Sequence, residues 1–230
     1  MPASPWILPD PTQADADGVL GVGADLQPST LVDAYRRGIF PWPHEQADLP
    51  WFSPDPRGIL EPAALRVSKS LRKTLRSCGW DVTVDAAFAE VVRCCAVTRG
   101  DEGTWITSEM ARAYQRLHRL GWAHSVEVWD GAELVGGLYG VQPGGVFTGE
   151  SMFHRRPDAS KVALVALVQR MTEAGGLLVD VQITTDHLAT LGARDWPRDR
   201  FLATLTDVRD RSVRMRTDRR PVIWLAPTHT

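Results

Sequence analysis

The chain has 230 residues, of which 43% are hydrophobic and 23% are charged. This composition is that of a globular protein that can bury a substantial core, and it excludes a disordered one. No stretch approaches the roughly 20 apolar residues that span a bilayer. Five acids precede the first arginine, which argues against a secretory signal, so we expect a cytoplasmic protein without a membrane partner. Three cysteines, Cys78, Cys94 and Cys95, provide neither a disulfide framework nor a zinc spacing, and we expect no metal.

The formal net charge is only −2, but the basic residues are unevenly distributed. One cluster without an acid contains Arg66, Lys69, Arg72, Lys73 and Arg76. A second stretch, from Arg194 to Arg220, holds nine arginines against five aspartates. Local basic surface attracts phosphates even on an acidic protein, and a solvated helix face is the alternative interpretation.

The first predicted helix covers Ser29 to Arg37 and ends at Gly38. Five prolines between Pro41 and Pro56 then exclude a regular helix, while the aromatic residues among them indicate a packed loop rather than a flexible linker. Ser68 to Cys78 is predicted to form a basic helix, and Trp80 to Val84 a strand.

Two more helices follow in the predicted order. We expect Asp85 to cap a helix that continues to about Val97, and Thr107 to cap a helix from Ser108 to Leu120. From Ala123 the apolar period changes to two, with turns at Asp130-Gly131 and Pro143-Gly144-Gly145. This pattern predicts an antiparallel meander of three strands, and its ranges are 123–129, 133–142 and 146–153.

The remaining elements are an apolar helix from Ala159 to Ala174 with Asp158 as its cap, and a strand from Leu177 to Gln182. Pro197 is predicted to begin a last helix, and Pro221 to Leu225 a last strand. Together these elements predict the α+β class, with a mainly antiparallel sheet flanked by helices. The acetyltransferase-like N-acyltransferase fold uses this order.

Polar residues on two apolar strands mark the candidate site, since carboxylates rarely lie in protein interiors. They are Glu150 on the third meander strand, and Asp180 and Gln182 on the next. Ser151 stands in a run that resembles a nucleophile elbow, but Phe153 occupies the position of the required glycine, so we do not expect a nucleophilic serine. The loop 154–158 lacks the glycines of a pyrophosphate loop, which favours an acyl donor other than coenzyme A.

Several blocks of sequence, in this order, match one known family. They are Tyr35-Arg36-Arg37-Gly38-Ile39-Phe40-Pro41-Trp42, Trp51-Phe52-Ser53-Pro54-Asp55-Pro56-Arg57, Gly103-Thr104-Trp105-Ile106-Thr107, His124 to Trp129, Leu134 to Gly140, Gly149 to Phe153, Ala159-Ser160-Lys161 and Asp180-Val181-Gln182. From about Asp25 to Phe201 the chain resembles the bacterial leucyl/phenylalanyl-tRNA-protein transferases. The resemblance implies a small N-terminal domain, residues 1–60, packed on an N-acyltransferase-like catalytic domain, residues 61–230.

The resemblance also implies an activity. The family moves Leu or Phe, and less readily Met, from aminoacyl-tRNA to proteins that begin with Arg or Lys, and so marks them for degradation. No cofactor is implied, because an aminoacyl ester is already activated and the enzyme must mainly align the amine and stabilise the tetrahedral oxyanion. We expect a monomer.

Roles for the site residues follow from the same resemblance. Gln182 is expected to bond the attacking amine or the oxyanion, Asp180 to polarise or orient it, and Glu150 to orient the amino group or ribose of the donor. The alternative is a structural pair at a strand end, with Glu150 tying neighbouring backbone. For the acceptor Arg or Lys, Glu127 and Asp186 are candidates, although each can be an ordinary acid.

Four apolar residues are expected to line the aminoacyl pocket, and by spacing alone they are equally well core residues: Leu138, Phe147, Met152 and Val179. Trp42 and Trp105 match the positions that hold the terminal adenosine, with plain packing as the alternative. The five basic residues between Arg66 and Arg76 are candidates for phosphate contacts along the acceptor stem.

The chain departs from the family pattern at two positions. Val181 replaces a frequent Cys, which removes a thiol nucleophile there, and His154 replaces a frequent Ser. Two alternatives stay open at this point: an acyl-CoA N-acyltransferase, and a noncatalytic module that recognises basic N-termini.

Overall fold

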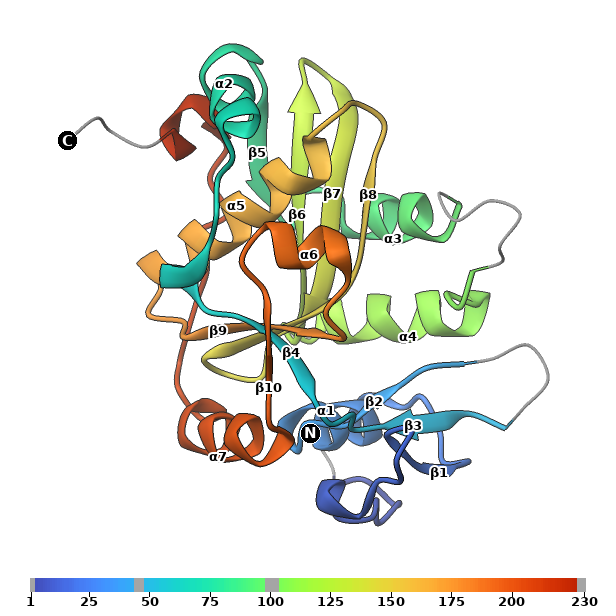
Figure 1. The fold of residues 1–230 in the computed structure, drawn as a ribbon. Coiled ribbons are helices and arrows are strands. Elements are labelled where there is room, and N and C mark those ends of the chain that lie inside the picture. Colours follow the sequence, from blue (N-terminus) through green and yellow to red (C-terminus); the bar gives the residue numbers. More distant parts are fainter. Residues whose placement is uncertain (1–2, 44–47, 98–103, 227–230) are drawn as a thin grey trace.

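The computed structural model describes residues 3–43, 48–97 and 104–226, and its strands form two sheets (Figure 1). A three-stranded sheet has the order β1-β3-β2, and an eight-stranded sheet has the order β10-β4-β9-β8-β7-β6-β5-β11. The strands are β1 (Val19–Val22), β2 (Phe40–Pro41), β3 (Pro50–Phe52), β4 (Arg57–Leu60), β5 (Asp81–Val84), β6 (Ala123–Asp130), β7 (Glu133–Val141), β8 (Val146–His154), β9 (Leu178–Gln182), β10 (Arg194–Trp196) and β11 (Arg220–Pro221).

The helices lie on both sides of the large sheet (Figure 1). They are α1 (Pro28–Arg36), α2 (Lys69–Ser77), α3 (Phe88–Val97), α4 (Ser108–Arg119), α5 (Ala159–Glu173), α6 (Asp186–Thr190) and α7 (Arg198–Val208), with short 3₁₀ turns η1 (Pro11–Gln13), η2 (Pro62–Ala64) and η4 (Val222–Leu225). None of the described helices is long and apolar enough to cross a membrane.

The predicted meander is confirmed, because β6, β7 and β8 pair in sequence and antiparallel. Among the described strands only β8 and β9 pair in parallel, and the helix α5 provides the crossover connection that such a pair needs. The α+β class with a mainly antiparallel sheet is therefore confirmed. Strand β4, which precedes the expected domain boundary at residue 60, is itself a strand of the large sheet, between β10 and β9.

Two apolar clusters cover the two faces of this sheet. One joins α2, α5 and η4 to β6 and β7, and buried residues of α5 such as Val162 and Leu167 form its centre. The other joins α1, α3 and α4 to the opposite face, with Tyr35, Tyr114 and Tyr139 among its buried members. The N-terminal part therefore shares its core with the helices α3 and α4.

The capping predictions had mixed outcomes. Thr107 accepts a hydrogen bond from the Met110 amide and Ser68 from the Leu71 amide, as an N-cap residue does. Asp85 does not cap α3: it takes a left-handed backbone, φ +62°, and its carboxylate accepts from the Ser125 amide instead.

The carboxylate of Glu127 takes the place of Asp85 at the start of α3, where it accepts hydrogen bonds from the Ala86 and Ala87 amides. Asp158 does stand at the N-cap position of α5, but its carboxylate accepts from Thr74 and Lys161 rather than from the helix backbone.

The expected strand from Pro221 to Leu225 is wrong for most of its length. Only Arg220–Pro221 pairs, with β5, and Val222–Leu225 forms the 3₁₀ turn η4. The buried residues of this segment are Val222 and Leu225, three positions apart. That spacing places both on one side of a turn with three residues per revolution, whereas a strand would place them on opposite faces.

Candidate active site

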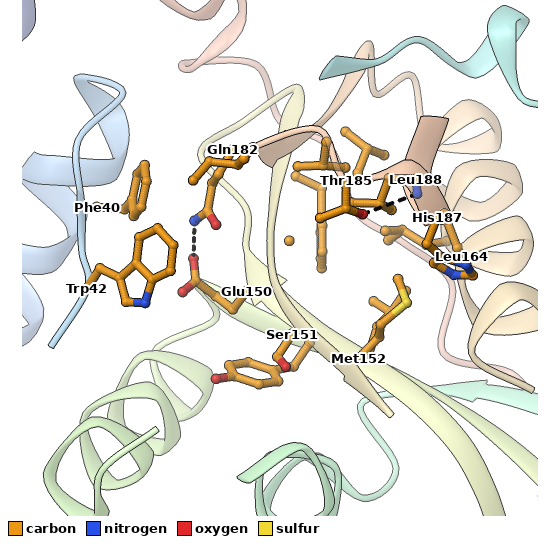
Figure 2. A pocket seen from close by; sticks show the side chains of 18 of the residues that line it. Phe40, Trp42, Glu150, Ser151, Met152, Leu164, Gln182, Thr185, His187 and Leu188 are labelled. Atoms are coloured by element: carbon orange, nitrogen blue, oxygen red, sulfur yellow. Dashed lines mark hydrogen bonds between the residues drawn. The ribbon is translucent and has the colours of Figure 1, made fainter. Parts of the chain in front are cut away.

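A cavity of about 340 Å³ lies where β8 and β9 meet, between β2 on one side and the helices α5 and α6 on the other (Figure 2). Its lining is mainly apolar, and polar groups enter it at a few points. All four predicted aminoacyl-pocket residues line it: Leu138, Phe147, Met152 and Val179. A small apolar chamber with few polar groups is the usual form of a ligand site.

The position of Glu150 results from a β-bulge. Gly140 of β7 is opposite Gly149, and Tyr139 is opposite Ser151, so Glu150 is the extra residue of β8. A side chain at Gly140 is excluded, since its Cβ would lie 2.2 Å from the Thr148 carbonyl oxygen. Because bulges redirect side chains, this irregularity points the carboxylate of Glu150 into the cavity. The strict alternation of a regular strand would not give it this direction.

Three donors hold the carboxylate of Glu150. Its oxygens accept from the Tyr35 hydroxyl at 2.8 Å, the Tyr114 hydroxyl at 2.6 Å and the Gln182 amide nitrogen at 3.1 Å. The two tyrosine hydroxyls are also 2.7 Å from each other. Tyr35 and Tyr114 are buried, so this network is largely closed to solvent.

Burial raises the pKa of Glu150 to about 7, although hydrogen bonds from Tyr114 and Tyr35 lower it and the charge of Asp180 raises it. Burial, and then the charge of Glu150, also raises the pKa of both tyrosines well above the ordinary value. The three oxygen–oxygen contacts need three protons, and the two hydroxyls supply two. A protonated Glu150 supplies the third. Because the pKa of Glu150 is about 7, both of its protonation states are accessible near neutral pH.

The backbone at Gln182 leaves the strand conformation, with φ +64°, and its amide nitrogen donates to the Asp180 carboxylate at 3.0 Å. Its side-chain nitrogen donates to Glu150, as the dashed line in Figure 2 shows. A carboxylate accepts this bond, so the amide must present its nitrogen to Glu150. The carbonyl oxygen of Gln182 is therefore the atom that remains for a ligand in the cavity.

Asp180 lies behind this wall and does not line the cavity. It is fully buried, and both of its oxygens accept from Arg57, from Nε and Nη2, each at 2.8 Å. Arg57 in turn lies between the rings of Phe40 and Phe201, 4.9 and 4.6 Å from their centroids. Asp180 thus contacts Gln182 through the backbone, while Glu150 contacts its side chain.

Trp42 and Trp105 both line the cavity. Trp42 extends from β2 beside Glu150 and packs edge-on against Phe52, with ring centroids 5.7 Å apart (Figure 2). Trp105 precedes α4, and Gly103 of its sequence block lies outside the described residues. Figure 2 shows Leu164, His187 and Leu188 on the other side of the cavity from Trp42, with Gln182 between. The indole of Trp42 and the residues Leu164, His187 and Leu188 therefore occupy different ends of the site.

One prediction about the acceptor is wrong. Glu127 is fully buried, and its carboxylate accepts from Thr83, Ser125 and the start of α3, so it is unavailable to a substrate. Asp186 is exposed at the first residue of α6, between Thr185 and His187, which both line the cavity.

The five basic candidates lie on α2 and just before it, and all are exposed: Arg66, Lys69, Arg72, Lys73 and Arg76. Ser151 lines the cavity, but within the described residues its hydroxyl bonds no histidine or carboxylate that would activate it.

Sequence reasoning missed several members of the site. Tyr35 and Tyr114 have the spacing of helix core residues, and nothing in the sequence connects them to Glu150. Arg57 and Tyr35 stand in family-matching blocks, which was a usable signal, but a motif does not show which side chains meet. Leu164, His187 and Leu188 carry no signal in the sequence.

A family model described as leucyl/phenylalanyl-tRNA protein transferase matches residues 59–206, and one described as the N-terminal domain of that transferase matches residues 24–55. The chain is 54% identical over 207 residues to the leucyl/phenylalanyl-tRNA–protein transferase of Anaeromyxobacter dehalogenans strain 2CP-C, covering 89% of this chain and 88% of that one. Relatives of the same name from Syntrophobacter fumaroxidans and Myxococcus xanthus are 55% and 52% identical, each covering 87% of both chains.

Among solved structures, a GCN5-related N-acetyltransferase from Kribbella flavida overlaps at a TM-score of 0.37 and 16% identity, covering 70% of this chain and 58% of that one. At this level the overlap bears on neither the fold nor the activity. The site and the sequence matches together define an aminoacyltransferase. The chain belongs to the leucyl/phenylalanyl-tRNA protein transferase family.

Proposed function

We propose that this protein transfers Leu or Phe, and less readily Met, from aminoacyl-tRNA to the N-terminal Arg or Lys of acceptor proteins in the cytoplasm, and so marks them for degradation. One observation carries the proposal: the Gln182 amide, held at 3.1 Å by Glu150, lies between the end of the cavity that holds Trp42 and an apolar end. The terminal adenosine of the donor stacks on Trp42 and Trp105, and its amino acid side chain enters the apolar end.

The reaction forms one bond and breaks one. The α-amino nitrogen of the acceptor attacks the ester carbonyl carbon, the carbonyl oxygen becomes an oxyanion, and the carbon–oxygen bond to the ribose then breaks. The ribose hydroxyl leaves with a proton, and the amine loses one as the peptide bond forms. An α-amino group has a pKa of about 7.7 to 8, so a substantial fraction is already neutral near pH 7.

In this reaction Gln182 is the group next to the amine. Its carbonyl oxygen accepts an N–H bond from the attacking nitrogen and so directs the lone pair at the ester. Asp180 does not touch the substrate; it holds the turned backbone of Gln182 through the 3.0 Å bond to its amide nitrogen. Glu150 orients the side chain of Gln182 and, beside it, the amino group or ribose of the donor.

Two further groups complete the proposal. Asp186, exposed at the rim on α6, attracts the acceptor's Arg or Lys side chain. The exposed basic residues from Arg66 to Arg76 contact acceptor-stem phosphates, largely independent of sequence, so selection among donors occurs in the cavity. We propose that the protein acts as a monomer.

The test is a transfer assay with a panel of charged tRNAs and a peptide that begins with Arg. Labelled Leu and Phe should enter the peptide, while a matched peptide that begins with Glu should remain unlabelled. Failure with both donors, in folded protein, contradicts the proposal. Calorimetry with coenzyme A distinguishes an acyl-CoA enzyme, and peptide binding without consumption of the ester distinguishes a noncatalytic module.

A further inference from the structure

The segment after α7, residues 209–219, here called the C-terminal strap, has no part in the site described above. It lies beyond the family-model match, which ends at residue 206. From Arg211 to Thr217 it contains three arginines and no acid. In Figure 1 it is the red irregular segment that runs from α7 toward η4, on the side of the molecule where α5 ends.

The strap is fixed in place by specific contacts. The side-chain nitrogen Nε2 of Gln142 donates to the Val213 carbonyl at 2.9 Å, and Arg219 donates to Asp81 at 2.8 Å. Arg170 of α5, 1% exposed, holds its far end through the carboxylate and the carbonyl of Asp218, at 2.7 and 2.6 Å. Anchors in its middle and at its far end make this an ordered surface rather than a loose tail.

The side chains of the strap alternate. Val213 and Met215 are partly buried and pack against the apolar cluster that contains α2 and α5, while Arg211, Arg214 and Arg216 are exposed. In extended chain, residues two apart are on the same side and about 6.6 Å from each other. The fold therefore presents Arg214 and Arg216 in a row and uses Val213 and Met215 to attach that row to the protein. Arg211 is exposed just before this alternation begins.

These arginines are available to a partner. Within the described residues, neither Arg211 nor Arg214 forms an ion pair. Arg216 lies 3.4 Å from the carboxylate of Asp218, which is already bonded to Arg170. The nearby acid Asp210 is paired with Arg36 at 2.6 Å. The row therefore has a net positive charge with five guanidinium donors on each arginine, which suits phosphate oxygens.

The strap also adjoins the other basic surface. It leads directly through β11 into η4, and η4 packs beside α2 in the same apolar cluster. The basic candidates on α2 and the arginines of the strap thus lie on the same side of the sheet as α5 and α6, whereas α3 and α4 lie on the other. A long polyanion is a ligand that suits both surfaces together.

We propose that Arg211, Arg214 and Arg216 of the C-terminal strap form a second phosphate-binding surface for the body of the donor tRNA, next to the one on α2. This inference rests on the proposed function, which makes tRNA the donor. Because the contacts are to backbone phosphates, they add affinity without selecting a sequence, and they weaken as salt rises.

The experiment measures binding of Phe-tRNA over a salt series for wild type and for R214Q/R216Q, which leaves Val213 and Met215 in place. Each lost phosphate contact lowers the slope of log affinity against log salt by about 1, so the variant's slope should fall by about 2. A fourfold rise in salt then weakens wild type about sixteenfold more than the variant. R214K/R216K, which keeps the charge, should retain the steep slope.

Two controls separate this surface from others. R112Q/R119Q removes two exposed arginines from α4, on the other side of the sheet, and should leave the slope unchanged. A phenylalanyl-adenosine amide, which has no phosphate, should bind wild type and R214Q/R216Q equally. An unchanged slope in R214Q/R216Q, or an equal fall in R112Q/R119Q, overturns the proposal. Wild type that binds tRNA but transfers nothing contradicts the proposed function instead, and the slopes still test the strap.

Discussion

Arg57 and Asp180 form a fully buried ion pair with two parallel hydrogen bonds, Nε and Nη2 each 2.8 Å from a carboxylate oxygen. The same carboxylate accepts from the Thr148 hydroxyl and from the Gln182 amide. The pair therefore joins β4, β8 and β9 directly behind the cavity wall. Its arrangement makes Asp180 a support for Gln182 rather than a group that contacts substrate.

Replacing Arg57 by Met should lower the free energy of unfolding by about 3–5 kcal/mol, because Asp180 is left charged and uncompensated in the interior. Denaturant unfolding measures this change. The double variant R57M/D180L, which removes both charges, should recover most of the loss. If Arg57→Met unfolds at the wild-type denaturant concentration, the pair is not the support described above.

Replacing Gln182 by Ala should lower the single-turnover rate of transfer by at least about 10²-fold, because the amine loses the acceptor that directs it. The affinity for Phe-tRNA should change little, since the indoles and the phosphate contacts remain. Gln169→Ala, which removes an exposed glutamine of α5 that does not line the cavity, is the matched control and should keep a rate close to wild type. Full turnover in Gln182→Ala contradicts the assigned role.

The raised pKa of Glu150 predicts a pH-dependent stability. Its pKa rises from 4.5 to about 7 on folding, so between these values the folded state binds the proton and the unfolded state does not. Stability from this group is fully present below pH 4.5 and is lost as the pH rises to 7, by about 3 kcal/mol.

Unfolding free energies measured from pH 4.5 to 8 should therefore fall more steeply for wild type than for Glu150→Gln, which cannot titrate. Other groups titrate equally in both proteins, so the difference between the two curves isolates Glu150. Parallel curves over this range are inconsistent with a Glu150 that is protonated in the interior.

Replacing Trp42 by Ala should weaken binding of phenylalanyl-adenosine amide by about 5- to 150-fold, as expected for the loss of one base-stacking contact. Trp42→Phe keeps a ring and should lose much less. Trp196→Ala, an indole outside the cavity, serves as the control. Calorimetry gives the three affinities, and equal affinity in Trp42→Ala and wild type rules out stacking at this position.

Much of the local structure was predictable because it depends on neighbouring residues. The meander followed from its period of two and its turn residues, and Ser68 and Thr107 cap their helices as their sequence positions indicate. The cap at α3 was not predictable, because Glu127 comes from a strand about forty residues away. The roles of the site residues remain predictions of the resemblance, now with a geometry that supports testing them.

The sequence by itself determined the class of fold, the family, four apolar residues of the cavity and the polar residues Glu150, Gln182 and Asp180 at or behind its wall. Each of these is recorded in local pattern or in blocks of matching residues. Only the tertiary structure decided which of those residues meet. The bulge that turns Glu150 inward, the left-handed backbone of Gln182 and the pairing of Asp180 with Arg57 all depend on contacts between distant segments. Hydrogen bonding and burial at such contacts are set by three-dimensional packing, and no spacing along the chain encodes them.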